Sequence, residues 1–399
     1  MLENRDIGGL LGLTSPWEVK DVKVSDDLVR VDVIVGTESG RMLECPGCGK
    51  LCGVHDRVRR MWRHLDIMSA ECYVTADIPR TKCGSCGILQ LRTPWAREYV
   101  SYTNEFEKKA LGLLRSMPIS RAAAEMGVDR SVIEGMMKHC VENILNGMDL
   151  SGVRRIMIDE TSSKRGRRYI TVITDADNGR IIFMAEGRGS DTLEKFSDWL
   201  TARGGDPRRI RWVSSDLSAS FISGIEAQLP MADIVYDPFH LVQTANKAMD
   251  DIRSKNQANG RRDKNIRFAL LRNSGNLSEK DKAAIFNIRR DNAVIGKAYE
   301  MKESLIQLYD YPDISSAAEH IRSWLDWVGE EGEPRMKQLA RTVSEHRNKI
   351  LNWYSSRMSN GFLEGLNGMI QTTKRMARGY RNIGNFITMI YFRHGRSGV

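Results

Sequence analysis

The sequence predicts a multidomain protein of the mixed α/β class, and three observations support this prediction. The chain has 399 residues, which exceeds one ordinary domain and allows two to four. Its N-terminal part combines strand-like alternation of apolar and polar residues with two C-x-x-C pairs. Its central part alternates short β-rich runs with helical segments, and several of the runs end in acidic residues. We therefore expect small N-terminal domains that are followed by a larger α/β core.

Composition narrows the class of protein. The formal net charge of +9 favours a polyanionic partner such as nucleic acid. Apolar runs fall short of the roughly 18 residues that a membrane span needs, and the N-terminus lacks the charged and apolar blocks of a signal peptide. We therefore expect a cytoplasmic, nucleoid-associated protein rather than a membrane protein. The seven cysteines, four of them in two tight pairs, indicate metal ligation more than disulfide bonding.

Residues 1–100 are predicted to form a β-rich zinc-ribbon domain. Alternation over residues 17–35 predicts a pair of strands that turn at Ser25. Each C-x-x-C pair is followed by glycine. This pattern is typical of zinc knuckles, tight turns in which backbone N–H groups point at the cysteine sulfurs. Four thiolates at about 2.3 Å from zinc form a closed tetrahedral site. We predict one structural zinc ion on Cys45, Cys48, Cys83 and Cys86.

The other cysteines, Cys52, Cys72 and Cys140, lack this spacing and are interpreted as packing residues. His55 and His64 are interpreted as surface residues, with replacement of a cysteine ligand as the alternative.

A basic run with one aromatic residue, Trp62, lies between the two knuckles. Arginines in such a run can hold DNA phosphates. Trp62 either stacks on a base or anchors the ribbon, and both alternatives stay open at this point. The predicted DNA-binding residues of the run are Arg57, Arg59, Arg60 and Arg63.

Residues 104–147 are predicted to form a helix-turn-helix domain. Helical patterns cover residues 105–115, 119–126 and 130–145, and Gly127 forces the turn before the last of them. Ala123 supplies the small residue that two crossing helices need. Arg130 and Ser131, together with Glu134, would then face DNA bases or phosphates. The alternative is a plain helical hairpin that links two domains.

Residues 152–240 are predicted to form the first part of an α/β core. Strand-like runs cover residues 156–158, 169–174, 181–185, 209–215 and 231–236, and Asn178-Gly179 joins the second and third runs as a hairpin. Helices are expected after the third and fourth runs. This order is that of a ribonuclease-H-like core, in which the first and fourth strands are neighbours. Asp159 ends the first run and Asp216 ends the fourth, so the two carboxylates would meet.

Two facing carboxylates repel each other unless they share a divalent cation, and oxygen ligands suit magnesium or manganese. A third carboxylate is expected from a helix that packs on the sheet. Glu364 is the only acidic residue between positions 359 and 399. A solvated helix face is the alternative role for this residue.

Helical spacing divides the segment around Glu364 into two faces. Its predicted polar face carries Glu364, Asn367, Gln371 and Lys374, and its predicted apolar face carries Phe362, Leu366, Met369 and Met376. The basic residues that would contact phosphates along the DNA backbone are Lys374, Arg375, Arg378 and Arg381.

Residues 241–350 are predicted to form a large all-helical insertion, because helical patterns alternate there with turn sequences. Residues 351–399 then complete the core with the Glu364 helix and a basic tail. The basic stretch over residues 255–272 is either a DNA contact or a solvated surface. Trp324, Trp327 and Trp353 are predicted core residues, with stacking on a displaced base as the alternative.

Together these features resemble the DDE transposases of bacterial insertion sequences, specifically the ISL-three (ISL3) family. The shared motifs span nearly the whole chain: CPGCG, CGSCG, the helix-turn-helix, IDET, SSD, DPFHLVQTANKAMDDIR and NGFLEGLNGMIQTTKRMARGYRN. The resemblance implies a catalytic triad of Asp159, Asp216 and Glu364. His240 matches the family's D-x-F-H motif and would orient a phosphate or a carboxylate.

The resemblance also implies a reaction. Two Mg²⁺ or Mn²⁺ ions per active site, held by the triad, would activate water for in-line attack at each element end, and the freed 3′-hydroxyl would attack target DNA. The zinc ribbon and helix-turn-helix would recognise terminal inverted repeats in double-stranded DNA, and the helical insertion would clamp the ends. Because two ends must be joined, we expect a homodimer or larger assembly on DNA. The alternatives are a structure-specific metal-dependent nuclease and an inactive DNA-binding regulator.

Overall fold

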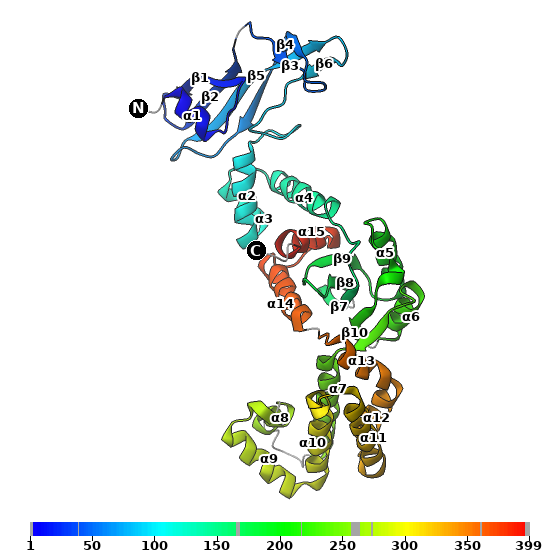
Figure 1. The fold of residues 1–399 in the computed structure, drawn as a ribbon. Helices are drawn as coiled ribbons and strands as arrows, with labels where there is room; N and C mark the ends of the chain where they lie inside the picture. The colour runs from blue at the N-terminus through cyan, green and yellow to red at the C-terminus, as the bar shows by residue number, and fades with distance from the viewer. Residues whose placement is uncertain are drawn as a thin grey trace. The chain divides into compact units, whose positions relative to one another are not determined.

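The structure is a computed structural model that describes residues 3–38, 40–164, 168–216, 218–256, 264–272, 274–359 and 361–395. The chain divides into two compact units, Met1–His139 and Cys140–Val399 (Figure 1). The division falls within helix α4 (Arg130–Asn146). In the described part of the chain, no helix is both long and apolar enough to cross a membrane.

A six-stranded sheet forms most of the first unit. Its path runs β1-β2-β5-β4-β3, with β6 paired to β5, and only β2 and β5 are parallel. The predicted strand pair over residues 17–35 is confirmed, because β1 and β2 are antiparallel neighbours. The elements of this unit before the helices are α1 (Asn4–Leu10), β1 (Trp17–Val24), β2 (Arg30–Thr37), β3 (Leu43–Glu44), β4 (Leu51–Arg63), β5 (Glu71–Cys83) and β6 (Gly87–Gln90).

Three tryptophans hold the core of this sheet together. Trp95 meets Trp17 and Trp62 edge to face, with ring centroids 4.9 and 5.4 Å apart. Trp62 is only 1% exposed, so it anchors the ribbon and does not present a face for base stacking. The buried valines of β2 and β5 alternate with more exposed residues, as expected for a sheet with one covered face.

The predicted helix-turn-helix segment contains α2 (Asn104–Ser116), α3 (Ile119–Glu125) and α4. Thr103 caps α2 by accepting a hydrogen bond from the backbone N–H of Phe106. Gly127 adopts a φ of +62°, which glycine tolerates and which turns the chain between α3 and α4. Ala123 is buried, as predicted for a helix crossing.

A five-stranded sheet organises the second unit, in the order β11-β10-β7-β8-β9. Strands β11, β10 and β7 are parallel, whereas β8 and β9 are antiparallel to their neighbours. The predicted adjacency of the first and fourth strands is confirmed, since Trp212 to Ser214 pair with Arg155 to Met157. The strands are β7 (Arg155–Lys164), β8 (Arg168–Asp175), β9 (Ile181–Glu186), β10 (Trp212–Ser215) and β11 (Asp233–Tyr236).

One sequence-based boundary was wrong. The first strand was predicted to end before Asp159, but β7 continues to Lys164 and pairs Asp159 with Val172 of β8. The polar residues after Asp159 remain in the strand because the antiparallel ladder with β8 satisfies their backbone groups. Asp159 therefore lies within a strand and not at its end.

Helices cover both faces of this sheet (Figure 1). On one face, α5 (Ser190–Thr201) and α6 (Ala219–Gln228) bury Phe196 and Phe221 against alternate residues of the strands. On the other, α14 (Gly361–Met376) packs against β7 and α15 (Ile383–His394) packs against β9. The end of the predicted basic tail, residues 396–399, lies outside the described residues.

Helices α7 to α13, which lie between β11 and α14 in the sequence, form a hydrophobic core of their own. Trp324 is buried there and donates a hydrogen bond of 2.8 Å from Nε1 to the carbonyl of Met301, which supports its predicted core role. Residues 333–350 have a continuous helical pattern but do not form one helix, because His346 separates two helices. Residues 257–263 of the predicted basic stretch lie outside the described part. The helices are α7 (Pro238–Asn256), α8 (Lys264–Leu271), α9 (Glu279–Asp291), α10 (Ala293–Ile306), α11 (Ile314–Glu331), α12 (Pro334–Glu345) and α13 (Arg347–Ser356).

The predicted apolar face of α14 also needs correction. Leu366 is buried as expected, but Phe362, Met369 and Met376 are exposed. The buried stripe consists instead of Leu363, Leu366, Ile370 and Thr373. The buried side of α14 is thus rotated from the predicted apolar face, and on it the Thr373 hydroxyl contacts Nε2 of His394 in α15 at 3.1 Å.

Candidate functional site

The four predicted zinc ligands converge. The sulfurs of Cys45, Cys48, Cys83 and Cys86 all lie within 4.8 Å of one another. Those of Cys48 and Cys83 are 3.6 Å apart, and a zinc tetrahedron with bonds of about 2.3 Å has edges of about 3.8 Å. The donor set and its spacing therefore fit a closed structural zinc site.

The second zinc knuckle, which begins at Cys83, favours the thiolate form of that cysteine. Hydrogen bonds from the backbone N–H groups of Ser85 and Cys86 lower the pKa of the Cys83 thiol to about 6. Two alternative ligands are engaged elsewhere: His64 contacts the Thr103 hydroxyl at 2.8 Å, and His55 lies 3.4 Å from Asp56.

The basic run lies on β4, whose residues alternate between two faces. Arg57 and Arg59 are exposed, and both contact Asp77. Arg60 lies on the same face of β4 as Trp62, and its guanidinium carbon is 5.7 Å from the centroid of the Trp62 ring. Arg63 differs, because its side chain is 10% exposed and its guanidinium bonds the backbone carbonyls of His64 and Cys72. The structure thus gives Arg63 a structural role within the fold, in place of the predicted phosphate contact.

The predicted DNA-contacting residues of the helix-turn-helix lie at the start of α4. Arg130 and Ser131 are both exposed. The guanidinium of Arg130 forms an ion pair of 2.7 Å with Glu134, one helical turn later. An exposed pair of this kind contributes little to stability, so Arg130 can exchange its partner for another anion.

In the second unit, the face of α14 that carries Glu364 packs on β7, as predicted. Asn367 donates a hydrogen bond of 2.6 Å to Oδ2 of Asp159. Further along the helix, Gln371 donates to the Thr161 hydroxyl at 2.8 Å, and Lys374 donates to the Ser162 carbonyl at 2.9 Å. Residues separated by three to four positions share one side of a helix, so these contacts fix which side of α14 meets the strand.

The carboxylates near this contact influence one another. Burial raises the pKa of Asp159, and the charges of Asp216 and Asp237 add to the effect. Burial likewise raises the pKa of Glu364, with smaller contributions from Asp237 and Asp159. Several acids in one partly buried region favour a bound cation, because a cation would offset their mutual repulsion.

Glu364 has a further property of a ligand. Its Oε1 atom is buried and accepts no hydrogen bond from the residues that the structure describes. Buried polar atoms usually have a partner, so an oxygen of this kind fits a cation ligand.

The three acids do not form a tight cluster. Among the described residues, the four cysteines are the only group of three or more potential ligands whose atoms all lie within 4.8 Å of one another. Ligands of a metal pair can lie farther apart than this, because the two metals are themselves about 3.5–4 Å apart.

Sequence interpretation missed the role of Asp237, which is buried at the end of β11. Its Oδ2 lies 3.2 Å from Nδ1 of His240, and this contact, opposed by burial, raises the pKa of the imidazole. The signal was available, because Asp237 follows a third parallel strand in the same way that Asp216 follows β10. The start of α7 at Pro238 made Asp237 resemble a helix cap.

The role of Glu160 was also missed, and Asn367 was placed on the polar face of α14 without its contact to Asp159. Burial, and then the charge of Asp216, raise the pKa of Glu160 to about 7. Arg188 lies 3.8 Å from the Glu160 carboxylate and lowers this pKa in part. Successive strand residues point to opposite faces, so periodicity alone could not show that the charge of Asp216 raises the pKa of both Asp159 and Glu160.

The remaining predicted basic residues, Arg375, Arg378 and Arg381, are exposed at and beyond the C-terminal end of α14.

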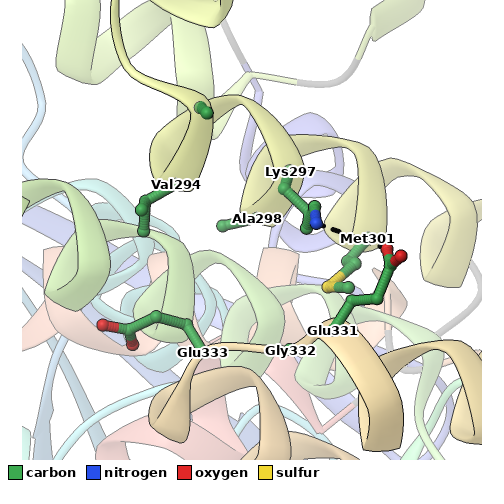
Figure 2. A pocket seen from close by; sticks show the side chains of 8 residues that line it. Val294, Lys297, Ala298, Met301, Glu331, Gly332 and Glu333 are labelled. Carbon is green, nitrogen blue, oxygen red and sulfur yellow. Dashed lines mark ion pairs between the residues drawn. The ribbon is translucent and has the colours of Figure 1, made fainter.

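A pocket of about 210 Å³ elsewhere has different chemistry (Figure 2). It lies between α10 and the junction of α11 with α12, where Lys297 forms an ion pair of 3.4 Å with Glu331. Glu333 adds a second acid, so this pocket does not suit a phosphate.

Comparisons with known proteins identify the family of this chain. Residues 156–390 match the model of a family described as transposase. Residues 91–141 match the helix-turn-helix domain of transposase family ISL3, and residues 43–86 match the zinc-finger of transposase IS204/IS1001/IS1096/IS1165. The chain is 28% identical over 408 residues to the transposase for insertion sequence element IS1557 of Mycobacterium tuberculosis, covering 94% of this chain and 91% of that protein. It is 26% identical over 392 residues to the transposase for insertion sequence element IS1001 of Bordetella parapertussis, covering 95% and 96%.

Proposed function

This chain belongs to the ISL3 family of transposases, and we propose that Asp159, Asp216 and Glu364 carry its DNA cleavage and strand transfer. Its substrates are the terminal inverted repeats of an insertion sequence and the target DNA. The observation that carries this proposal is the contact between α14 and β7. Through the hydrogen bond from Asn367 to Asp159, the helix face of Glu364 is held against the strand of the first acid.

The catalytic domain is proposed to be ribonuclease-H-like. The parallel pairing of β10 with β7, next to the antiparallel β8 and β9, supports this fold. Residues 152–240 and 351–399 form the two parts of this domain, and residues 241–350 are inserted between them. Residues 1–100 and 104–147 form the zinc ribbon and the helix-turn-helix that recognise the inverted repeats.

Asp159, Asp216 and Glu364 are proposed ligands of two Mg²⁺ or Mn²⁺ ions. Such a pair, when bound, stabilises the entering and leaving oxygens of an in-line displacement at phosphorus. The protein fixes the position of the Asp159 carboxylate. Asn367 donates a hydrogen bond of 2.6 Å to one of its oxygens, and the backbone N–H of Glu160 donates one of 2.7 Å to the other. The buried Oε1 of Glu364 supports its assignment as a ligand.

His240 is proposed to contact a phosphate oxygen of the DNA. Asp237 lies against Nδ1 of His240, which leaves Nε2 as the nitrogen that can donate to the substrate. The raised pKa of His240 favours its charged form, and a charged imidazole binds an anionic phosphate better than a neutral one. Asp237 thereby acts as a positioning residue.

The proposed partners and metal follow from the same chemistry. One zinc ion on the four cysteines stabilises the ribbon. Joining two element ends requires a homodimer or larger assembly on double-stranded DNA, and this assembly is part of the proposal.

An excision and integration assay tests the proposal. A plasmid that carries the two inverted repeats is incubated with the protein and Mg²⁺, and Asp159→Asn, Asp216→Asn and Glu364→Gln are each expected to abolish excision while retaining DNA binding. Glu194→Gln, at an exposed position on α5, is the matched control and should excise normally. Excision that persists in the triad variants would refute the assignment. Cleavage without joined products would identify a nuclease instead.

A further inference from the structure

A groove of about 400 Å³ lies beside the zinc cluster in the first unit. We call it the knuckle groove. Its walls are the first knuckle at Pro46 and Gly47, residues 89–93 after β6, residues 97–99, and the side chains of Arg60 and Trp62 on β4. Gly47 is closely packed, since a Cβ there would lie 3.1 Å from Leu89 and 3.2 Å from Cys86. The wall is therefore held in place by the folded zinc site.

The knuckle groove is lined by three arginines and one exposed acid, Glu98, so its net charge is positive. Arg97 is bound to Glu107 through two contacts of 2.9 and 3.0 Å, so its charge is largely neutralised. Within the described part of the chain, Arg60 and Arg92 form no ion pair, and Arg60 contacts only uncharged groups, the carbonyl of Val100 at 3.5 Å and the ring of Trp62. Two guanidinium groups of this kind suit a phosphate, which accepts hydrogen bonds from both.

Tyr99 adds an aromatic surface to this site. Its side chain is 90% exposed, although tyrosine normally buries much of its ring. Its backbone has a φ of +62°, in the left-handed region that bulky residues rarely occupy. Unfavourable backbone conformations in folded proteins concentrate at binding and catalytic sites. The fold thus holds an exposed aromatic ring in the same groove as two arginines that form no ion pair with the described residues.

We propose that the knuckle groove binds one unpaired nucleotide of DNA. Arg60 and Arg92 hold its phosphate, and the ring of Tyr99 stacks on its base. An internal base of a duplex is covered by its neighbours on both faces, whereas an unpaired base can offer a face to Tyr99. The volume of the groove suits a single nucleotide and not a duplex. This inference rests on the proposed function, because DNA cleavage at element ends supplies unpaired strands.

The test compares two probes with the full-length protein. One is a fluorescein-labelled duplex of an element end, and the other is the same end with five unpaired nucleotides at its 3′ terminus. Fluorescence anisotropy gives the Kd of each. Tyr99→Gly removes the ring and suits the left-handed backbone, and it should weaken binding of the unpaired probe about tenfold while changing duplex binding less than about twofold. Arg92→Ala should also weaken binding of the unpaired probe more than duplex binding.

Matched controls exclude general effects. Leu28 is also exposed and left-handed, with a φ of +60°, and it lies in the β1–β2 turn. Leu28→Gly should leave both affinities unchanged, and Tyr99→Phe should preserve binding of the unpaired probe because it keeps the ring.

Three results would overturn this inference alone. Tyr99→Gly could bind the unpaired probe as tightly as the natural protein, or it could weaken both probes equally. The natural protein could also show no preference for the unpaired probe over the duplex, which would leave the proposed function intact. Failure of the natural protein to bind either probe would overturn both proposals together.

Discussion

The side-chain amide of Asn367 donates a hydrogen bond of 2.6 Å to Oδ2 of Asp159 across 208 positions of sequence. This contact joins α14 to β7 at the first proposed metal ligand. Glu364 lies one helical turn before Asn367 and therefore faces the same side. Removing the contact should disturb the position of two proposed ligands at once.

Replacing Asn367 should slow DNA cleavage without preventing DNA binding. Asn367→Leu removes the donor while keeping a similar volume, and we expect a loss of about 10- to 100-fold in the single-turnover rate, as for other residues that orient metal ligands. Asn367→Asp should slow cleavage further, because it places a second negative charge against Asp159. Met369→Leu, on the exposed side of α14, is the control. Equal cleavage rates in all variants would contradict this prediction.

Zinc should be required for the fold of the ribbon. Cys83→Ser should lose the metal, lower the thermal stability of the first unit and weaken duplex binding. Cys52→Ser is the matched control, because Cys52 packs beside the cluster but bonds the carbonyl of Lys50. Metal content is measured by atomic emission after gel filtration. Retention of zinc by Cys83→Ser, or its loss from Cys52→Ser, would argue against the four-cysteine assignment.

Asp250 should make stability depend on pH in the acid range. Although burial opposes the effect, hydrogen bonds from Arg267 and Arg253 lower the pKa of Asp250 below its ordinary 3.8. A lowered folded-state pKa contributes stability above the unfolded value, and this contribution is lost as pH falls through the folded value. Asp250→Asn should therefore destabilise the protein by about 1–3 kcal/mol at pH 7 and progressively less below pH of about 4.

Urea unfolding at several pH values, monitored by the circular dichroism signal of the helices, tests the prediction for Asp250. Asp291→Asn is the control, because Asp291 is exposed and pairs only with its neighbour Arg290. A destabilisation that is constant with pH would show that the charge of Asp250 is not responsible.

Basic residues at the end of α14 should differ in their effects. Arg378→Gly, which suits the φ of +54° at this position, and Arg381→Ala should weaken binding of all DNA sequences and reduce the salt slope of log K by about 1 each. Lys374→Met should act differently, because Lys374 bonds the carbonyl of Ser162 and so holds α14 on β7. We expect it to lower the cleavage rate with little change in salt slope. An unchanged slope in the arginine variants would exclude phosphate contacts there.

Much of the fold was predictable from local pattern. Alternating residues and the Asn178-Gly179 turn predicted the β8–β9 hairpin, and the order of strands predicted that β7 and β10 are neighbours. The spacing of the cysteines predicted a cluster that the structure contains. Membership of the transposase family was also predicted correctly. The predictions of the hairpin and the cysteine cluster depend on sequence periods or spacings that backbone geometry imposes, whereas family membership was predicted from the resemblance of the motifs.

The errors concern which partner a side chain finds. Arg63 lies in a basic run, but its guanidinium is used by backbone carbonyls inside the fold. Phe362 and Met369 are apolar, yet α14 turns them to the surface and buries Thr373. Asp237 was overlooked because its contact with His240 forms within a turn that also begins a helix. Local sequence gives hydrophobicity and charge, but only the packed neighbours decide these three outcomes.

The length of β7 has a consequence for self-association. Strand β10 pairs with β7 up to Met157, whereas β7 continues to Lys164. Beyond Met157, the side chains of Gln371 and Lys374 occupy the carbonyl of Ser162 on this open border. An uncovered strand border invites another chain to add a strand and aggregate. By occupying this carbonyl, helix α14 hinders the addition of a foreign strand at this part of β7.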